Sequence, residues 1–122
     1  MATLLVNAGR DILTNRIRGA GTEPVYGAWG TGAGTTAATD TTLFTEASEA
    51  RVSGTASRVT TSTANDTWQL VWTMTANANK TITNAGCFDA SSSGNLFIKF
   101  DFTGQTLNTN DQIQFTVKAQ FA

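Results

Sequence analysis

The sequence contains no histidine and a single cysteine, Cys87, and only 14% of its residues are charged. Without histidine the chain has neither a Ser-His nor a Cys-His nucleophile, and it lacks the ligands of most zinc sites. A lone cysteine cannot form a disulfide within the chain. The 8 basic and 9 acidic residues leave a net charge of −1, so a basic surface typical of nucleic-acid binding is missing. The composition therefore favours a non-enzymatic binding or structural protein without cofactor, metal or nucleic-acid partner.

Long hydrophobic runs are missing as well. The apolar run at residues 1–6 is too short for a signal peptide, and charged residues follow it between positions 10 and 18. No stretch has the length and hydropathy of a membrane span, so no membrane partner is expected. Together with the unpaired cysteine, this predicts assembly in a reducing cytoplasm. At 122 residues, the chain is expected to form one domain over residues 1–122.

One segment, residues 7–18, has a helical pattern. Asn7 is placed to cap its first turn, and Gly19 is placed to adopt the left-handed conformation that ends a helix. A second, very short helical turn, capped by Asp40, is predicted within residues 41–49. We expect the N-terminal helix to cover an edge or an end of the remaining fold. Its apolar face comprises Ile12, Leu13 and Ile17.

Most of the remaining chain shows the two-residue period of strands with one buried face. In residues 67–76 the alternation assigns Trp68 and Trp72 to the core, whereas Gly54 indicates a bulge or an edge position. Short strands joined by turns, with no helices between them, predict a mainly β protein. The expected fold is an antiparallel β-sandwich of the jelly-roll or immunoglobulin-like type, or a flattened barrel, with one short N-terminal α-helix. Strands are predicted at residues 25–30, 51–62, 67–76, 81–89, 95–102 and 112–121.

The last predicted strand alternates most strictly. Its apolar face comprises Ile113, Phe115, Val117, Ala119 and Phe121. Its polar face comprises Gln112, Gln114, Thr116, Lys118 and Gln120. Buried amides need replacement hydrogen bonds, so this polar face is expected to meet either solvent or a neighbouring subunit. We expect a homo-oligomer, with a trimer favoured.

The segment 30–40 is rich in glycine, threonine and alanine and predicts an irregular surface loop. It is not a phosphate-binding loop, because neither a helix nor a lysine follows its glycines. We expect it to contact a partner and to be mobile in the free protein. Trp29, beside the loop, and Tyr26 are the candidates for an exposed aromatic contact. The predicted partner-binding residues are Trp29, Gly30, Thr31, Gly32, Gly34, Thr35 and Arg51.

The acidic residues show no pattern of catalytic or calcium sites. Asp40, Glu46 and Glu49 could in principle supply a glycosidase pair, but solvated charges or pairs with Arg51 and Arg58 are the expected role. The remaining candidates, Asp89 and Asp111, stand at strand ends where Asx turns are common, and Cys87 is expected to be a small buried hydrophobe.

Three groups of motifs resemble small structural proteins of tailed bacteriophages. The first is YGAWGTG at residues 26–32, followed by TTAATDTTL at 35–43 and EARV at 49–52. The second is TITNAGCFD at residues 81–89. The third is the alternating D-x-I-x-F-x-V at residues 111–117 with a terminal Phe121. In this order and spacing, the resemblance extends over most of the chain, from Asn7 to Phe121.

The resemblance implies a virion component. It points first to a capsid decoration, or cement, protein, which would bind the outside of the major capsid protein shell and stabilise it. Such proteins are commonly trimeric. The alternative is a tail or fibre module that binds a glycan on the host surface. Both imply a non-enzymatic protein located in the virion.

Overall fold

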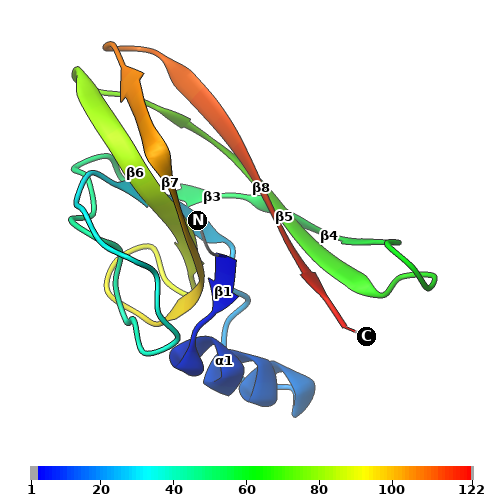
Figure 1. Cartoon of the computed structure of the whole chain (residues 1–122). Coiled ribbons are helices and arrows are strands. Elements are labelled where there is room, and N and C mark those ends of the chain that lie inside the picture. Colours follow the sequence, from blue (N-terminus) through cyan, green and yellow to red (C-terminus); the bar gives the residue numbers. More distant parts are fainter. Residues whose placement is uncertain (1–2, 122) are drawn as a thin grey trace.

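A computed structural model describes residues 3–121 as two antiparallel β-sheets packed face to face, with one helix across an end (Figure 1). Met1 and Ala2, which begin the short apolar run noted above, and Ala122 lie outside the described residues. The first sheet has the order β1-β7-β6-β2-β3, and the second has the order β4-β5-β8. The elements are β1 (Thr3–Leu5), α1 (Asn7–Ile17), β2 (Tyr26–Gly30), β3 (Val52–Ser53), β4 (Thr55–Val59), β5 (Thr67–Thr75), β6 (Lys80–Phe88), β7 (Leu96–Leu107) and β8 (Gln112–Gln120). The predicted antiparallel β-sandwich with one short helix is confirmed.

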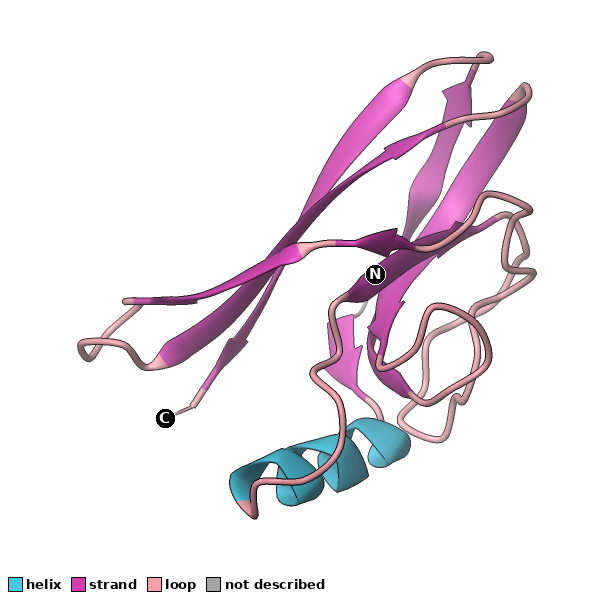
Figure 2. Cartoon of the chain, turned by 180° about the vertical axis from the view of Figure 1, so that it is seen from behind, coloured by secondary structure: helices cyan, strands magenta, loops and turns pink. Residues whose placement is uncertain are grey.

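Helix α1 has the predicted position but different ends. Asn7 is the first helical residue and not the cap; the backbone carbonyl of Val6 instead accepts hydrogen bonds from the N–H groups that open the helix. At the other end Gly19 adopts φ = +82°, as predicted. Ile12 is buried but Ile17 is 86% exposed. The apolar face was therefore predicted one turn too long, because the last turn extends beyond the sheets that the helix covers (Figure 2).

The core between the sheets follows the alternation read from the sequence. Leu70, Trp72 and Met74 of β5 are buried. Trp72 stacks on Phe115 of β8 with ring centroids 5.1 Å apart. Its indole lies against Gly27 of β2, where a Cβ atom would come within 2.3 Å of the ring. The close packing of the sheets therefore requires glycine at this position.

The chain changes sheets at Gly54, between the short strands β3 and β4. A Cβ atom at Gly54 would lie 2.7 Å from the carbonyl oxygen of Val71. Because β3 ends the five-stranded sheet and β4 ends the three-stranded sheet, the edge position predicted from this glycine is confirmed. Strand β7, in contrast, is longer than predicted. It runs through Gly104 to Leu107, where a break was expected, and pairs with the start of β6.

The five-stranded sheet is buried on both faces at residues 85–88 of β6 and 96–99 of β7. Residues 31–50, which we term the cover loop, lie along its outer face (cyan to green in Figure 1). Beneath the loop is a second apolar cluster formed by Val6, Ala28, Leu43, Phe88 and Leu96. The helical turn predicted within residues 41–49 is absent; this part of the loop has bends, a positive φ at Thr45 and one β-bridge from Glu46 to Gly30.

Candidate functional site

The predicted partner-binding glycines do not form an independent loop. Gly30 ends β2, and the N–H groups of Thr31 and Gly32 donate to the carbonyls of Thr45 and Phe44 at 3.0 and 2.9 Å. A Cβ atom would lie 2.4 Å from the Phe44 carbonyl oxygen at Gly30, and 2.7 Å from the Phe44 ring at Gly34. The glycines therefore allow two passes of the cover loop to touch, a role that sequence reasoning interpreted as flexibility.

The predicted partner-binding residues in this segment differ in their solvent exposure. Gly30 is buried and Gly32 is half-buried, while Thr31, Gly34 and Thr35 are exposed. A contact between this part of the loop and a partner stays a prediction, and only the three exposed residues offer surface for it.

Lys99 of β7 holds the cover loop from below. Its side chain is fully buried, and Nζ lies 2.9 Å from Asp40 Oδ2 and 2.9 Å from the carbonyl oxygen of Thr42. The same ammonium lies 3.2 Å from the centroid of the Phe44 ring. Burial raises the pKa of Asp40, but the hydrogen bond from the Ala37 N–H and the charge of Lys99 outweigh this effect and leave it below its ordinary value. Sequence alternation placed Lys99 on the outward face correctly and missed that this face is covered.

Asn84 of β6 supplies a second attachment for the loop. Its amide is fully buried. Oδ1 accepts from the backbone N–H of Phe44 at 3.0 Å, and Nδ2 donates to the carbonyl of the same residue at 3.1 Å. One side chain thus satisfies both backbone groups of Phe44, as a neighbouring strand would.

The side chain of Arg51, one of the predicted partner-binding residues, is mostly buried and bonded within the chain. It is 8% exposed and forms a two-pronged ion pair with Glu46, with both N···O distances 2.9 Å. The same guanidinium donates to the carbonyls of Ala90 and Ser93 and lies 3.5 Å above the ring of Phe88. Arg51 therefore joins the end of the cover loop to the β6–β7 turn. The predicted pairing with Glu46 is confirmed.

Trp29 is likewise not a surface aromatic, since only 1% of it is exposed. Its indole N–H donates to Glu49 Oε1 at 2.9 Å, and its ring meets Phe115 edge-on. The other candidate aromatic, Tyr26, is half-buried. The prediction that Trp29 offers an exposed aromatic contact is therefore wrong, whereas Tyr26 keeps part of its surface exposed.

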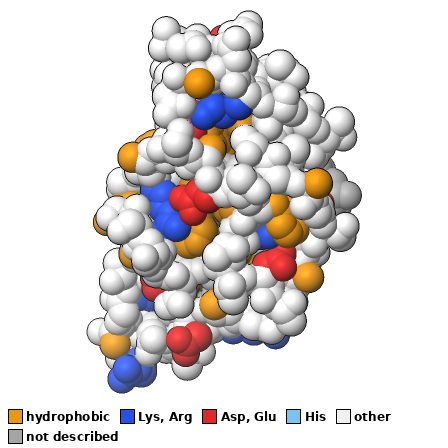
Figure 3. Space-filling view, turned by 90° about the vertical axis from the view of Figure 1, so that its left-hand side faces the viewer, with side chains coloured by type: hydrophobic (Ala, Val, Ile, Leu, Met, Phe, Trp, Pro, Cys, Tyr) orange, Lys and Arg blue, Asp and Glu red, His pale blue; other side chains and the backbone are white. Residues whose placement is uncertain are grey.

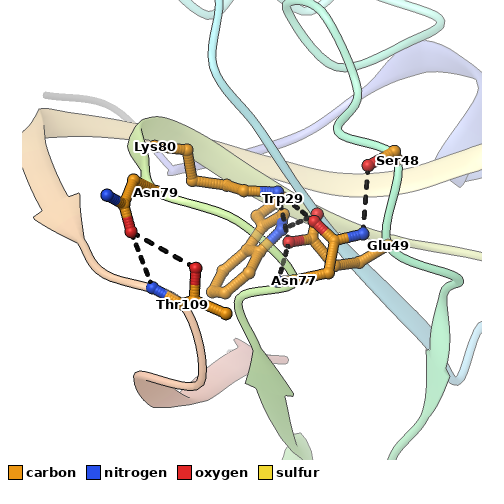
Figure 4. A network of polar contacts seen from close by, with 7 residues as sticks. All are labelled: Trp29, Ser48, Glu49, Asn77, Asn79, Lys80 and Thr109. Carbon is orange, nitrogen blue, oxygen red and sulfur yellow. Dashed lines mark hydrogen bonds and ion pairs between the residues drawn. The ribbon is translucent and has the colours of Figure 1, made fainter.

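Glu49 is the centre of a polar network at the end of the cover loop (Figure 4). Besides Trp29 it accepts from the backbone N–H of Asn77 at 3.0 Å and pairs with Lys80. Burial raises the pKa of Glu49, but these donors, led by Lys80, outweigh it and lower the pKa to about 2. Glu49 pairs with Lys80 and not with the arginines predicted from the sequence.

The carboxylates once considered for catalysis are thus separated. Asp40, Glu46 and Glu49 each form an ion pair with a different basic residue: Lys99, Arg51 and Lys80. The space-filling view likewise shows acidic and basic side chains next to each other, surrounded largely by uncharged surface (Figure 3). Among residues 3–121, no group of three or more His, Cys, Asp or Glu side chains is placed to hold a metal ion. No helix in this part of the chain is long and apolar enough to cross a membrane.

An open, largely apolar cavity of about 150 Å³ lies between α1 and the lower end of the three-stranded sheet. Trp68 packs edge-on against Phe97 there, with ring centroids 5.2 Å apart. Phe121, predicted to face the core, follows the end of β8 and is 54% exposed at this cavity. Its lining comprises Ile12, Leu13, Arg16, Glu23, Pro24, Trp68, Phe97 and Phe121. Sequence patterns did not predict this cavity, because its residues come from five separate segments.

The sequence model of the family described as "Podophage GP4 fiber I protein gp80" matches residues 1–120. No curated protein and no solved structure matches the chain significantly.

Proposed function

Since the chain belongs to the podophage GP4 fiber I protein family, and is thereby a structural protein of the tailed-phage virion, we propose that it is a non-enzymatic component of the tail fibre. The family match over residues 1–120 is the observation that carries this proposal. It favours the fibre alternative of the sequence analysis over capsid decoration, because the family is described as a fibre protein.

The arrangement of the cover loop supports a structural role. Asp40, Glu46 and Glu49, the carboxylates of this region, are each occupied by an ion pair that fastens the loop to the sandwich. Catalytic carboxylates of a glycosidase face each other across a substrate, whereas these three face separate basic partners. The polar groups of this region therefore serve to hold a loop of low apolar content on a sheet.

The location in the virion can be tested on purified particles. We expect gold-labelled antibodies to bind at the tail fibres, and quantitative mass spectrometry to find far fewer copies than of the coat protein. A copy number close to that of the coat protein, with label over the head, would refute the fibre assignment. It would support the capsid surface and the major capsid protein as partner, which stay predictions, as does the homotrimer.

Host-glycan binding is a second candidate function, supported by the cavity between α1 and the three-stranded sheet. The half-buried Trp68 and the exposed Phe121 present aromatic surface, on which sugar rings stack, and Arg16 and Glu23 supply charged hydrogen-bonding groups beside it. This cavity replaces the surface around Trp29, which the structure buries.

A matched pair of variants tests glycan binding. Phe121→Ser removes an exposed aromatic from the cavity, and Ile17→Ser removes an exposed apolar side chain that does not line it. We expect Phe121→Ser alone to lower binding of the purified protein to host surface polysaccharide by about tenfold, the loss expected from one stacking contact. Equal binding by the wild type and both variants would refute this candidate.

A further inference from the structure

A lysine, an asparagine and a glutamate meet at the turn where the chain passes from β5 to β6 (Figure 4). Lys80 Nζ donates to Asn77 Oδ1 at 2.9 Å and also to Glu49 Oε2. The ion pair accounts for the contact with Glu49, but it does not require an amide carbonyl beside the same nitrogen. A primary amine, a carboxamide and a carboxylate that accepts protons are the three groups needed to form an amide bond between two side chains.

The amine is held close to the carbon atom that it would attack. With Nζ 2.9 Å from Asn77 Oδ1, the bonded Cγ atom lies about 3–4 Å from Nζ, which overlaps the separation of about 3–3.5 Å in a near-attack geometry. The carboxamide is fixed from its other side, because Nδ2 donates to Ser48 Oγ at 3.1 Å. The side chains of Lys80 and Glu49 are only 11% and 7% exposed, so little water separates the amine from its neighbours.

Glu49 is positioned to accept protons from this amine. Its Oε1 accepts from the Trp29 indole N–H at 2.9 Å, and its Oε2 accepts from the backbone N–H of Asn77 at 3.0 Å. These donors hold the ionised carboxylate against Lys80 Nζ. Asn77 itself is exposed, so water can hydrogen-bond to its carbonyl oxygen when that oxygen gains negative charge during an attack.

We propose that Lys80 and Asn77 react to form an amide bond between their side chains, with Glu49 as the proton carrier. Nζ gives one proton to Glu49, and the lone pair that it keeps forms the Nζ–Cγ bond. The Cγ–Nδ2 bond then breaks, and its electron pair leaves with Nδ2. Because both nitrogens are bonded to one carbon at that stage, Glu49 can pass the proton from one to the other.

The reaction needs no further reactant. A second proton of Lys80 Nζ follows the same path, so the side-chain nitrogen of Asn77 leaves as an ammonium ion. The lysine nitrogen keeps one hydrogen as an ordinary amide, and Glu49 is ionised again. No atom is oxidised or reduced. Each molecule reacts once, so the step is a self-modification and not enzymatic turnover.

The bond would close the turn that connects the three-stranded sheet to the five-stranded sheet. Glu49 would keep its hydrogen bonds from Trp29 and from the backbone of Asn77, so the end of the cover loop would stay attached. A chain with one cysteine has no internal disulfide. An amide between side chains would give it a covalent cross-link that a reducing environment does not break.

Intact-mass spectrometry and trypsin digestion of the full-length protein test the bond. After incubation of the folded protein at pH 8, we expect most molecules to have lost the mass of one ammonia. Trypsin should then release residues 59–99 from the denatured chain as one peptide, because Lys80, its internal basic residue, is no longer free. Cyclisation of an asparagine onto its own backbone would lose the same mass but leave Lys80 cleavable, giving peptides 59–80 and 81–99. That digest, or the full mass of the sequence, would overturn the proposal.

Variants identify the reacting groups. Lys80→Arg keeps a positive charge beside Glu49 but supplies no nucleophile, because a guanidinium stays protonated, and it should keep the full mass. Asn77→Ala should keep it as well. The matched control is Asn79→Ala, since Asn79 accepts from Thr109 and should not be needed for the loss of ammonia. Loss of ammonia in Lys80→Arg or Asn77→Ala, or its dependence on Asn79, would overturn the proposal.

The role of Glu49 is measured as a rate. Glu49→Gln removes the proton acceptor and should slow the loss of ammonia by about a hundredfold, the size of a general acid–base contribution. Wild-type protein held in urea should keep its full mass, because unfolding separates the three side chains. An unchanged rate in Glu49→Gln, or loss of ammonia with an uncleaved Lys80 in urea, would overturn the mechanism.

Discussion

Replacing Lys99 by methionine tests whether the cover loop depends on its buried cation. Methionine keeps an unbranched apolar side chain in the fully buried position and removes the ammonium. The ion pair with Asp40, the bond to the Thr42 carbonyl and the contact with the Phe44 ring are lost together. The substitution therefore separates the charge from the packing of the strand.

The expected loss of stability follows from the exposure of the partner. Removing one member of a fully buried ion pair costs about 3–5 kcal/mol, because the other charge is left without a partner or water. The side chain of Asp40 is 20% exposed and can regain part of its hydration. We therefore expect Lys99→Met to lower the free energy of unfolding by about 2–3 kcal/mol.

Urea denaturation measures this loss. The control is Lys118→Met, which replaces an exposed lysine of β8 and should have a free energy of unfolding within about 0.5 kcal/mol of the wild type. Brief chymotrypsin digestion reports separately on the loop, where Leu43 and Phe44 are cleavage sites. We expect cleavage there in Lys99→Met and protection in the control. If Lys99→Met unfolds at the same urea concentration as Lys118→Met and its loop resists cleavage, the reasoning is refuted.

Three further predictions concern the core and the Glu49 network. The ionised Glu49 contributes stability that is fully present above its ordinary pKa of 4.5 and is lost as the pH falls toward about 2. Urea titrations at several pH values should therefore show a smaller loss of stability over this range for Glu49→Gln than for the wild type. Parallel pH curves for the two proteins would contradict this. Trp72→Ala should lower the free energy of unfolding by about 3–5 kcal/mol, and an unchanged thermal midpoint would argue against its place in the core. Burial raises the pKa of the Cys87 thiol to about 12, so a thiol reagent at pH 8 should label it only after denaturation, and rapid labelling of the native protein would be inconsistent with the structure.

Sequence alternation predicted the strands well where one face of a sheet meets the core. Leu70, Trp72 and Met74 were assigned correctly because β5 belongs to a sheet with one covered face. The same rule does not distinguish buried from exposed residues in the part of the five-stranded sheet that the cover loop also covers on its outer face. Lys99 was therefore placed on the correct face with the wrong burial.

The candidate site was less predictable, because its contacts join distant parts of the chain. Trp29 looked exposed beside a glycine-rich segment, but its burial depends on Glu49 and Phe115. Gly30 and Gly34 carry no local sign that they pack against Phe44. Long-range hydrogen bonds of this kind leave no periodic signal in a single sequence, so residues 30–40 were interpreted as a mobile loop.

The attachments of the cover loop also constrain the order in which the protein can fold. Lys80, Asn84 and Lys99, which hold the loop, all belong to the β6–β7 hairpin, and Lys99 follows Asp40 by 59 residues. Strand β1 has its partner in the same β7. During synthesis, the first fifty residues therefore leave the ribosome before most of their partners exist. Loops that close over such distances form slowly, so we expect the hairpin to assemble first and the N-terminal half to dock on it afterwards.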